Sequence, residues 1–181
     1  TGSFNVAVGD VTLRNASGNF NIAIGGEALT SNTTASNNTA VGYQSLYSNT
    51  TGTLNTVVGR QAAYNMTTGT DNSALGTNAL NTNTTGSYNT ALGREALYAN
   101  TTASNNTAVG YQAGYSNVGL NSTFIGYQAG YNNVTTGGTT NCFVGYNSGS
   151  EITTGYANTI IGSYNGNQGG LDIRTSATSG N

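Results

Sequence analysis

The stretch Asn38-Thr39-Ala40-Val41-Gly42 decides the fold, because it returns along the chain at a nearly constant interval. The same five residues stand at 106–110, and close variants occupy eight further places. The glycines that close the ten copies follow one another at intervals of 16 to 19 residues, most often 17. They are Gly9, Gly25, Gly42, Gly59, Gly76, Gly93, Gly110, Gly126, Gly145 and Gly162. A constant period of this length is typical of a solenoid with one repeat per coil.

Aligned on the closing glycine, the copies form columns of similar residues. The position before the glycine is always Val, Ile or Leu, the second position before it is mostly Ala, and the fourth is Asn in nine copies of ten. Polar turns such as Asn49-Thr50-Thr51-Gly52 separate the copies. Because β-branched residues favour strands and Asn and Gly favour turns, each repeat predicts a strand of about five residues, a Gly break, a second short apolar stretch and a turn.

These columns predict an all-β fold, a parallel β-solenoid of about ten coils of about 17 residues that spans residues 1–165. Coils stacked about 4.8 Å apart turn each column into a ladder. We expect an amide ladder in the Asn column and a positive φ or a close backbone approach in the Gly column. The central ladder residues are Asn38, Asn55, Asn72, Asn89 and Asn106, with Gly42, Gly59, Gly76, Gly93 and Gly110.

The two ends of the sequence indicate a piece of a longer protein. The opening Thr1-Gly2-Ser3-Phe4-Asn5 echoes the internal stretch at residues 85–89. Residues 166–181 depart from the repeat, and we expect them to form a C-terminal transition or capping segment to a further domain. Leu171-Asp172-Ile173-Arg174 alternates and predicts one closing strand.

Strand alternation places the aliphatic column and the Ala column on opposite faces of each strand. A coil of about 17 residues is thin, so one face lines its interior and the other faces outward. We expect the small, flat Ala face to pack against a second surface, which predicts self-association of the chain around a common axis.

The repeated Asn-Thr-Ala-Val-Gly resembles the repeats in the YadA-like heads of trimeric autotransporter adhesins. The longer unit at residues 42–52, Gly-Tyr-Gln-Ser-Leu-Tyr-Ser-Asn-Thr-Thr-Gly, is similar to tandem repeats of bacteriophage tail-fibre proteins and related bacterial surface proteins. The resemblance covers about residues 1–165. It implies a left-handed parallel β-roll, three chains wrapped into a homotrimeric rod, and an adhesive or host-recognition role. Adhesin head repeats are usually nearer fourteen residues, so the coil here is longer.

The composition argues against several classes of function. The chain has four Arg, no Lys and a net charge of −2, and nucleic-acid binding needs several basic residues on phosphates. It has no His and a single Cys, so the common general base, metal ligand and disulfide framework are missing. No apolar run reaches the roughly 20 residues of a membrane helix. We therefore expect no enzymatic activity, catalytic residue, cofactor, metal site, nucleic-acid partner or membrane insertion.

Tyrosines recur one and five residues after the closing glycine, beside Gln44, Gln112 and Gln128. Stacked along a rod, they would form an aromatic stripe suited to sugar stacking and hydrogen bonding, or would pack across a subunit interface. The candidate glycan-contact residues are Tyr43, Tyr47, Tyr111, Tyr115, Tyr127 and Tyr131.

The function expected from these features is that of a structural or adhesive fibre segment, extracellular, on a virion fibre or a cell surface. Its partners would be further copies of the chain in a homotrimer, and a host-surface glycan or protein receptor. Two alternatives remain open. One is a self-assembling extracellular filament, and the other is an ice-binding solenoid built on the Thr column three residues before the glycine.

Overall fold

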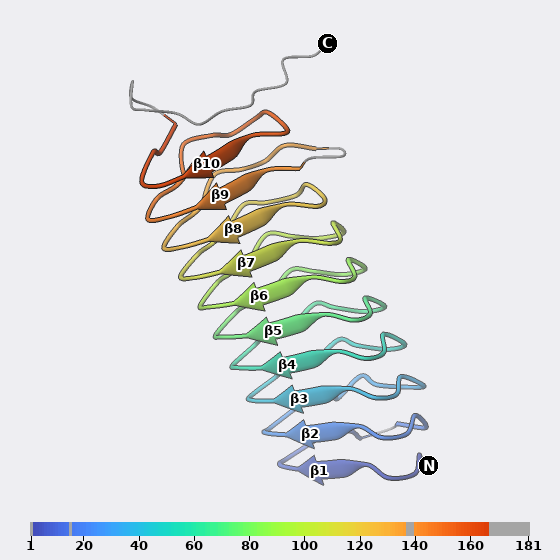
Figure 1. Cartoon of the computed structure of the whole chain (residues 1–181). Helices are drawn as coiled ribbons and strands as arrows, with labels where there is room; N and C mark the ends of the chain where they lie inside the picture. The colour runs from blue at the N-terminus through green and yellow to red at the C-terminus, as the bar shows by residue number, and fades with distance from the viewer. Residues whose placement is uncertain (1, 15, 137–139, 167–181) are drawn as a thin grey trace.

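The computed structural model describes residues 2–14, 16–136 and 140–166, and they form a parallel β-solenoid (Figure 1). Ten strands pair in chain order in a single sheet, and the described residues contain no helix. The strands are β1 (Val6–Val8), β2 (Ile22–Ile24), β3 (Thr39–Val41), β4 (Thr56–Val58), β5 (Ser73–Leu75), β6 (Thr90–Leu92), β7 (Thr107–Val109), β8 (Thr123–Ile125), β9 (Cys142–Val144) and β10 (Thr159–Ile161). Each coil is numbered below after its strand. The closing strand expected at residues 171–174 lies outside the described residues.

Like residues stack on like residues along the whole rod. In β3 and β4, Thr39 pairs with Thr56 and Val41 pairs with Val58. The remainder of the coil is bonded in the same register, since the Leu46 amide donates to the Ala62 carbonyl at 3.0 Å. The repeat period therefore becomes a set of ladders, as the sequence predicts.

The strands have three residues rather than the expected five, because each is bounded by backbone in the left-handed region. The residue two before β3, Asn37, has φ 60°, and Gly42 directly after it has φ 132°. Two more left-handed residues follow at the next corner, Gln44 and Leu46, both with φ 54°. Single residues of this kind turn the chain sharply, so straight extended backbone persists only between the corners.

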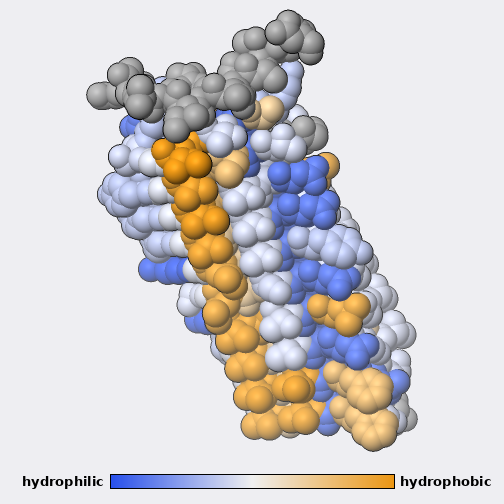
Figure 2. Space-filling model, in the orientation of Figure 1, coloured by the Kyte–Doolittle hydropathy of each residue, from blue (hydrophilic) through white to orange (hydrophobic). Residues whose placement is uncertain are grey.

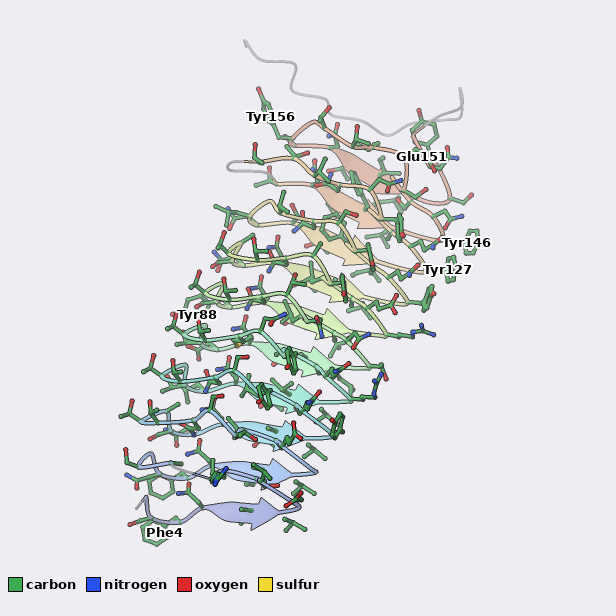
Figure 3. All side chains as sticks on the ribbon, turned by 180° about the vertical axis from the view of Figure 1, so that it is seen from behind. Phe4, Tyr88, Tyr127, Tyr146, Glu151 and Tyr156 are labelled. Carbon is green, nitrogen blue, oxygen red and sulfur yellow. The ribbon has the colours of Figure 1, made fainter. Side chains whose placement is uncertain are left out.

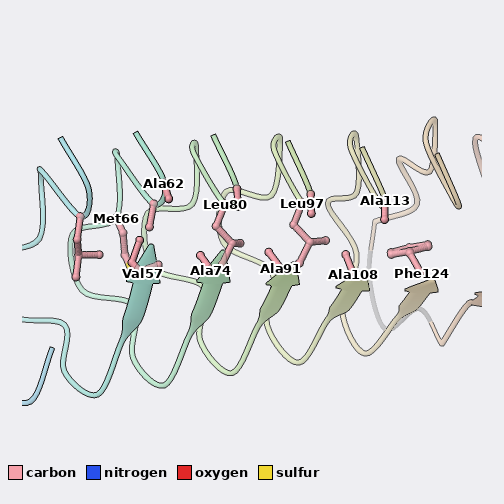
Figure 4. Close-up of a cluster of buried hydrophobic side chains, with 14 of the residues drawn as sticks. Val57, Ala62, Met66, Ala74, Leu80, Ala91, Leu97, Ala108, Ala113 and Phe124 are labelled. Carbon is pink, nitrogen blue, oxygen red and sulfur yellow. The ribbon is translucent and has the colours of Figure 1, made fainter. Parts of the chain in front are cut away.

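The Ala column fills the interior of the solenoid, and this overturns the expected orientation of the strands. Ala40, Val57 and Ala91, each two residues before the closing glycine, are completely buried. Figure 4 shows this column facing Leu80 and Leu97 from the opposite wall of the coil. The opposing Leu leaves room only for a small residue. The aliphatic column consequently faces outward.

The Asn ladder is confirmed and runs inside the rod. The side-chain oxygen of Asn55 accepts hydrogen bonds from both the backbone amide and the side-chain amide of Asn72, at 3.0 and 3.1 Å. The Asn72 side chain also donates to the Gly86 carbonyl at 3.0 Å. In coil 8 Ser122 replaces Asn, and its backbone amide still donates to the Asn106 oxygen at 2.9 Å. Asn106 Nδ2 is buried with no hydrogen-bond partner in the described chain, so the ladder is incomplete at this coil. These amides satisfy backbone groups that would otherwise be buried without partners.

Two interior columns compensate for each other in side-chain size, so that a large residue in one column is met by a small residue in the other. Five coils carry Leu four residues after the closing glycine, and coils 7 to 9 carry Gly there instead. The strand position opposite is Ala in most coils but Phe124 and Phe143 in coils 8 and 9, both fully buried. A methyl group added to Gly114 would lie 2.6 Å from Phe124 Cδ2. The large interior side chain is therefore the Leu after the closing glycine in five coils and the strand Phe in coils 8 and 9, and the interior stays filled in both arrangements.

This exchange predicts strong coupling between positions 114 and 124. Phe124→Ala should lower the free energy of unfolding by about 3 kcal/mol through the cavity it leaves. Gly114→Leu should also destabilise, because the new side chain overlaps the Phe124 ring. The double variant restores the Leu–Ala pairing of the earlier coils, so thermal and denaturant unfolding should show a favourable coupling of about 2 kcal/mol. Additive losses would contradict the exchange.

Candidate functional site: the outer sheet face and the tyrosine stacks

The outer face of the sheet carries a continuous aliphatic strip. It consists of the residues directly before the ten closing glycines: Val8, Ile24, Val41, Val58, Leu75, Leu92, Val109, Ile125, Val144 and Ile161. Figure 2 shows this strip running the length of the rod. All ten side chains are exposed or half-buried, with Leu75 at 52%. Exposed apolar residues scattered singly are ordinary on a protein surface, whereas this strip is continuous over ten coils, which makes it a candidate interaction surface.

Beside the aliphatic strip lies an uncharged column, the first residue of each strand, which is apolar in coils 1 and 2 and mostly Thr or Ser in the others. Coils 3 to 8 and coil 10 carry Thr or Ser there, and coil 9 carries Cys142, which is half-buried. The outer face of the ten strands thus holds no charged residue. The Thr ladder is flanked by aliphatic residues and not by a second Thr ladder, so the two-Thr face expected of an ice-binding solenoid is not formed on these strands.

The tyrosines form stacks in two columns, as the alignment predicts. Tyr111, Tyr127 and Tyr146 stack with ring centroids 5.3 and 5.2 Å apart. A second stack joins Tyr98, Tyr115 and Tyr131, each neighbouring pair 5.0 Å apart. Tyr47 stacks on Tyr64, and the Tyr43 ring lies near Gly26. Figure 3 shows Tyr127 and Tyr146 one above the other at one edge of the rod, with Phe4 and Tyr88 at the opposite edge.

Stacking changes what the tyrosines offer to a ligand. In the three-ring stacks the planes of neighbouring rings lie within 4 to 17° of parallel. The faces between rings are therefore occupied by other rings, and each stack presents ring edges and hydroxyl groups outward. A sugar could stack only on a terminal ring. Along the length of a stack, recognition would depend on hydrogen bonds to the phenol row.

A side-chain ladder that the sequence did not predict runs along the corner, two residues after the closing glycine. Gln112 donates to Glu95 Oε2 at 2.7 Å, and Gln128 donates to Gln112 Oε1 at 2.7 Å. Glu27, Gln44 and Gln61 repeat the arrangement lower on the rod. Each ladder begins with Glu, which can only accept. The sequence feature that could have revealed these ladders is a Glu followed by Gln at the same position of the next two coils.

The Arg94 side chain is 62% exposed, yet it contacts its neighbours at the corner. Its guanidinium pairs with Glu95 Oε1 at 3.2 Å and lies 5.8 Å from the centre of the Tyr111 ring.

The pKa of the Tyr115 hydroxyl is raised, first by burial and then by Tyr131, Tyr98, Glu95 and Tyr111. A raised pKa stabilises the protonated folded state up to the ordinary tyrosine pKa, and this contribution is lost as the pH rises through the folded value.

The described residues contain no group of three or more His, Cys, Asp and Glu side chains that could hold a metal ion. Glu27 and Glu95 lie in one column but four coils apart, about 19 Å at the rise of a β-sheet, which is too far for a two-carboxylate glycosidase site. No helix in the described part of the chain is long and apolar enough to cross a membrane.

Comparison with family models, curated proteins and solved structures gives no match. The case for function therefore rests on the surfaces of this chain. The structure brings the candidate tyrosines into stacks: Tyr111 with Tyr127, and Tyr115 with Tyr131. Tyr47 joins a separate pair several coils away, and Tyr43 has no aromatic stacking partner among the described residues.

Proposed function

We propose that this chain is a structural and adhesive segment of an extracellular fibre, in which three copies associate through the aliphatic strip. The observation that carries the proposal is the strip itself, which is apolar over ten coils and lies on a face with no charged residue. A straight surface that repeats once per coil is matched in spacing by another copy of the same surface. Self-association would remove the strip from water, which favours assembly by about 25 cal/mol per Å² of apolar area.

The number of chains and the handedness belong to the same proposal and rest on the resemblance to tail-fibre repeats and YadA-like heads. Three left-handed rolls around one axis would bring three strips together as a common core. The association predicted from the sequence is kept, but its contact surface changes from the Ala column to the aliphatic column.

With the strips turned inward, the tyrosine stacks and Glu–Gln ladders would be the surfaces that a trimer repeats around the fibre. A phenol row beside amide and carboxylate groups suits a ligand rich in hydroxyl groups, such as a host-surface glycan, and could also contact a protein receptor. Three chains with repeated stacks would add weak contacts through effective concentration. If the tyrosine stacks contact no ligand, the segment would act as a spacer within the fibre.

The proposal is tested by the mass of the chain in solution. We expect light scattering to give three times the chain mass and negative-stain images to show short rods. Val58→Asp, Leu75→Asp and Leu92→Asp together place three charges on the strip. Because charges are costly to bury, this variant should be monomeric while its circular dichroism stays unchanged.

The matched control places the same three charges in the exposed turns of the same coils, as Thr68→Asp, Thr85→Asp and Thr102→Asp. This control should keep the mass of the unmodified chain. A monomeric unmodified chain would contradict the proposal, and long fibres that grow with concentration would favour the filament alternative.

A further inference from the structure

The apolar surface is not uniform along the rod, because it widens in coils 1 and 2. There the first strand residue is Val6 or Ile22 rather than Thr, and the residue two before the strand is Phe4 or Phe20. The exposed fractions of this N-terminal patch are high: Phe4 78%, Val6 47%, Val8 57%, Phe20 56%, Ile22 39% and Ile24 39%. Figure 2 shows the widening at the end of the rod that Figure 1 marks N.

The two phenylalanine rings are held as one unit. Phe4 and Phe20 stack with centroids 5.1 Å apart and planes within 3° of parallel. Both residues have left-handed backbone, with φ 59° and 58°, a conformation in which Asn is the ordinary alternative to Gly. Coil 3 has Asn37 at this place, with φ 60°. An aromatic side chain here is not required by the corner, so its exposure calls for another explanation.

A repetitive strip has a weakness as an interface between copies of one chain. In coils 3 to 8 and in coil 10 the outer face shows the same kind of pair, Thr or Ser beside an aliphatic residue, and coil 9 has Cys142 in place of Thr. A copy displaced by one coil, about 4.8 Å, would meet almost the same partners. Register is weakly specified wherever neighbouring alignments bury equivalent side chains.

From this we propose that the N-terminal patch sets the register in which copies of this chain associate, with the patch of a second copy as its occupant. The inference rests on the proposed self-association. In the aligned arrangement the Phe4 and Phe20 pairs of neighbouring copies cover one another. A slip of one coil sets Phe20 of one copy against Asn37 of the other, and a slip of two coils removes all contact between the patches.

The test converts coils 1 and 2 to the outer residues of coil 3, with Phe4→Asn, Val6→Thr, Phe20→Asn and Ile22→Thr. These positions are exposed and Asn suits the corner, so the chain should fold. The matched control is Leu54→Asn, the same kind of change in the Phe column at an isolated residue 54% exposed.

Register is read by cross-linking in a Cys142→Ser background. One isotope-labelled chain carries Thr90→Cys, and an unlabelled chain carries Thr107→Cys in the same outward column one coil further on. The two are mixed, allowed to assemble and oxidised, so that disulfides join only cysteines whose Cβ atoms lie about 3.5–4.5 Å apart. Links between equal positions report aligned copies, whereas links between positions 90 and 107 report a one-coil slip.

With the patch intact, we expect links between equal positions to dominate. The four-residue variant should raise the share of 90–107 links several-fold, and Leu54→Asn should leave it unchanged. An unchanged share in the four-residue variant would overturn this inference alone, while the proposed assembly would stand. A chain that gives no interchain links and the mass of a monomer would overturn both.

Discussion

Gly76→Ala should prevent the solenoid from forming a stable coil at its centre, with a loss of more than about 4 kcal/mol in the free energy of unfolding. Gly76 has φ 141°, where side chains are strained by about 1–3 kcal/mol. Its added methyl group would also lie 2.5 Å from the carbonyl oxygen and 2.6 Å from the carbonyl carbon of Gly93 in the next coil. Since hydrogen bonds hold both coils in the stack, neither backbone can move away from the other to relieve the overlap. Denaturant unfolding followed by circular dichroism measures the loss.

Two other glycines separate the causes of this loss. Gly162 closes coil 10 with φ 116°, but an added methyl group would meet nothing within 4 Å, so Gly162→Ala should show the backbone strain alone. Gly26 lies next to the column, and its methyl group would meet only the Tyr43 ring, at 3.6 Å. Gly26→Ala should be neutral or slightly stabilising, because it reduces the freedom of the unfolded chain. Equal losses at Gly76 and Gly162 would contradict the role given to close packing between coils.

Asn72→Ala should cost about 4 kcal/mol, because it removes the middle of the interior amide ladder. The Asn72 oxygen accepts from the backbone and side-chain amides of Asn89, at 3.0 and 3.1 Å. Its own amide donates to Asn55 and to Gly86. Alanine leaves these partners buried and unpaired, and each unpaired group costs about 1–3 kcal/mol. Thermal and denaturant unfolding give the measurement.

Serine at the same place should lose less. Ser122 occupies the Asn column naturally, and its hydroxyl still accepts from the Asn141 amide at 3.3 Å. Asn72→Ser should therefore fall between the unmodified chain and Asn72→Ala. The control Asn81→Ala removes a half-buried Asn that makes one hydrogen bond, to the Gln61 carbonyl, and should cost about 1 kcal/mol or less. If Asn72→Ala cost no more than Asn81→Ala, the ladder would not be a main source of stability.

Much of the candidate surface could be predicted because it follows from repetition. Once coils stack in register, residues one period apart must be neighbours, so the stacking of Tyr111 on Tyr127 follows from their spacing. What repetition does not give is the orientation of a side chain within its ladder. The alignment of the ring planes, which hides the ring faces, depends on the backbone at the corner. The Glu–Gln ladders depend on it in the same way.

The sequence by itself determined the class of fold, the coil period, the ladder of Asn and the positions where only Gly fits. Each of these is a local choice repeated in nine or all ten of the copies, and repetition makes the signal stronger than in an ordinary domain. The Asn column and the Gly column were both found as predicted, with Gly42 at φ 132° against the next coil.

Only the tertiary structure decided which face of the strand is inside. Alternation defines two faces but not the direction in which the coil closes. Closure depends on corners where Gln44 and Leu46 adopt a left-handed backbone that such residues ordinarily avoid at a cost of about 1–2 kcal/mol. Burial of the Leu46 side chain, worth about 1.5–3 kcal/mol, offsets that cost and occupies the interior opposite the strand. Alanine is what fits beside it, so the aliphatic strip is left on the outside, where a partner can cover it.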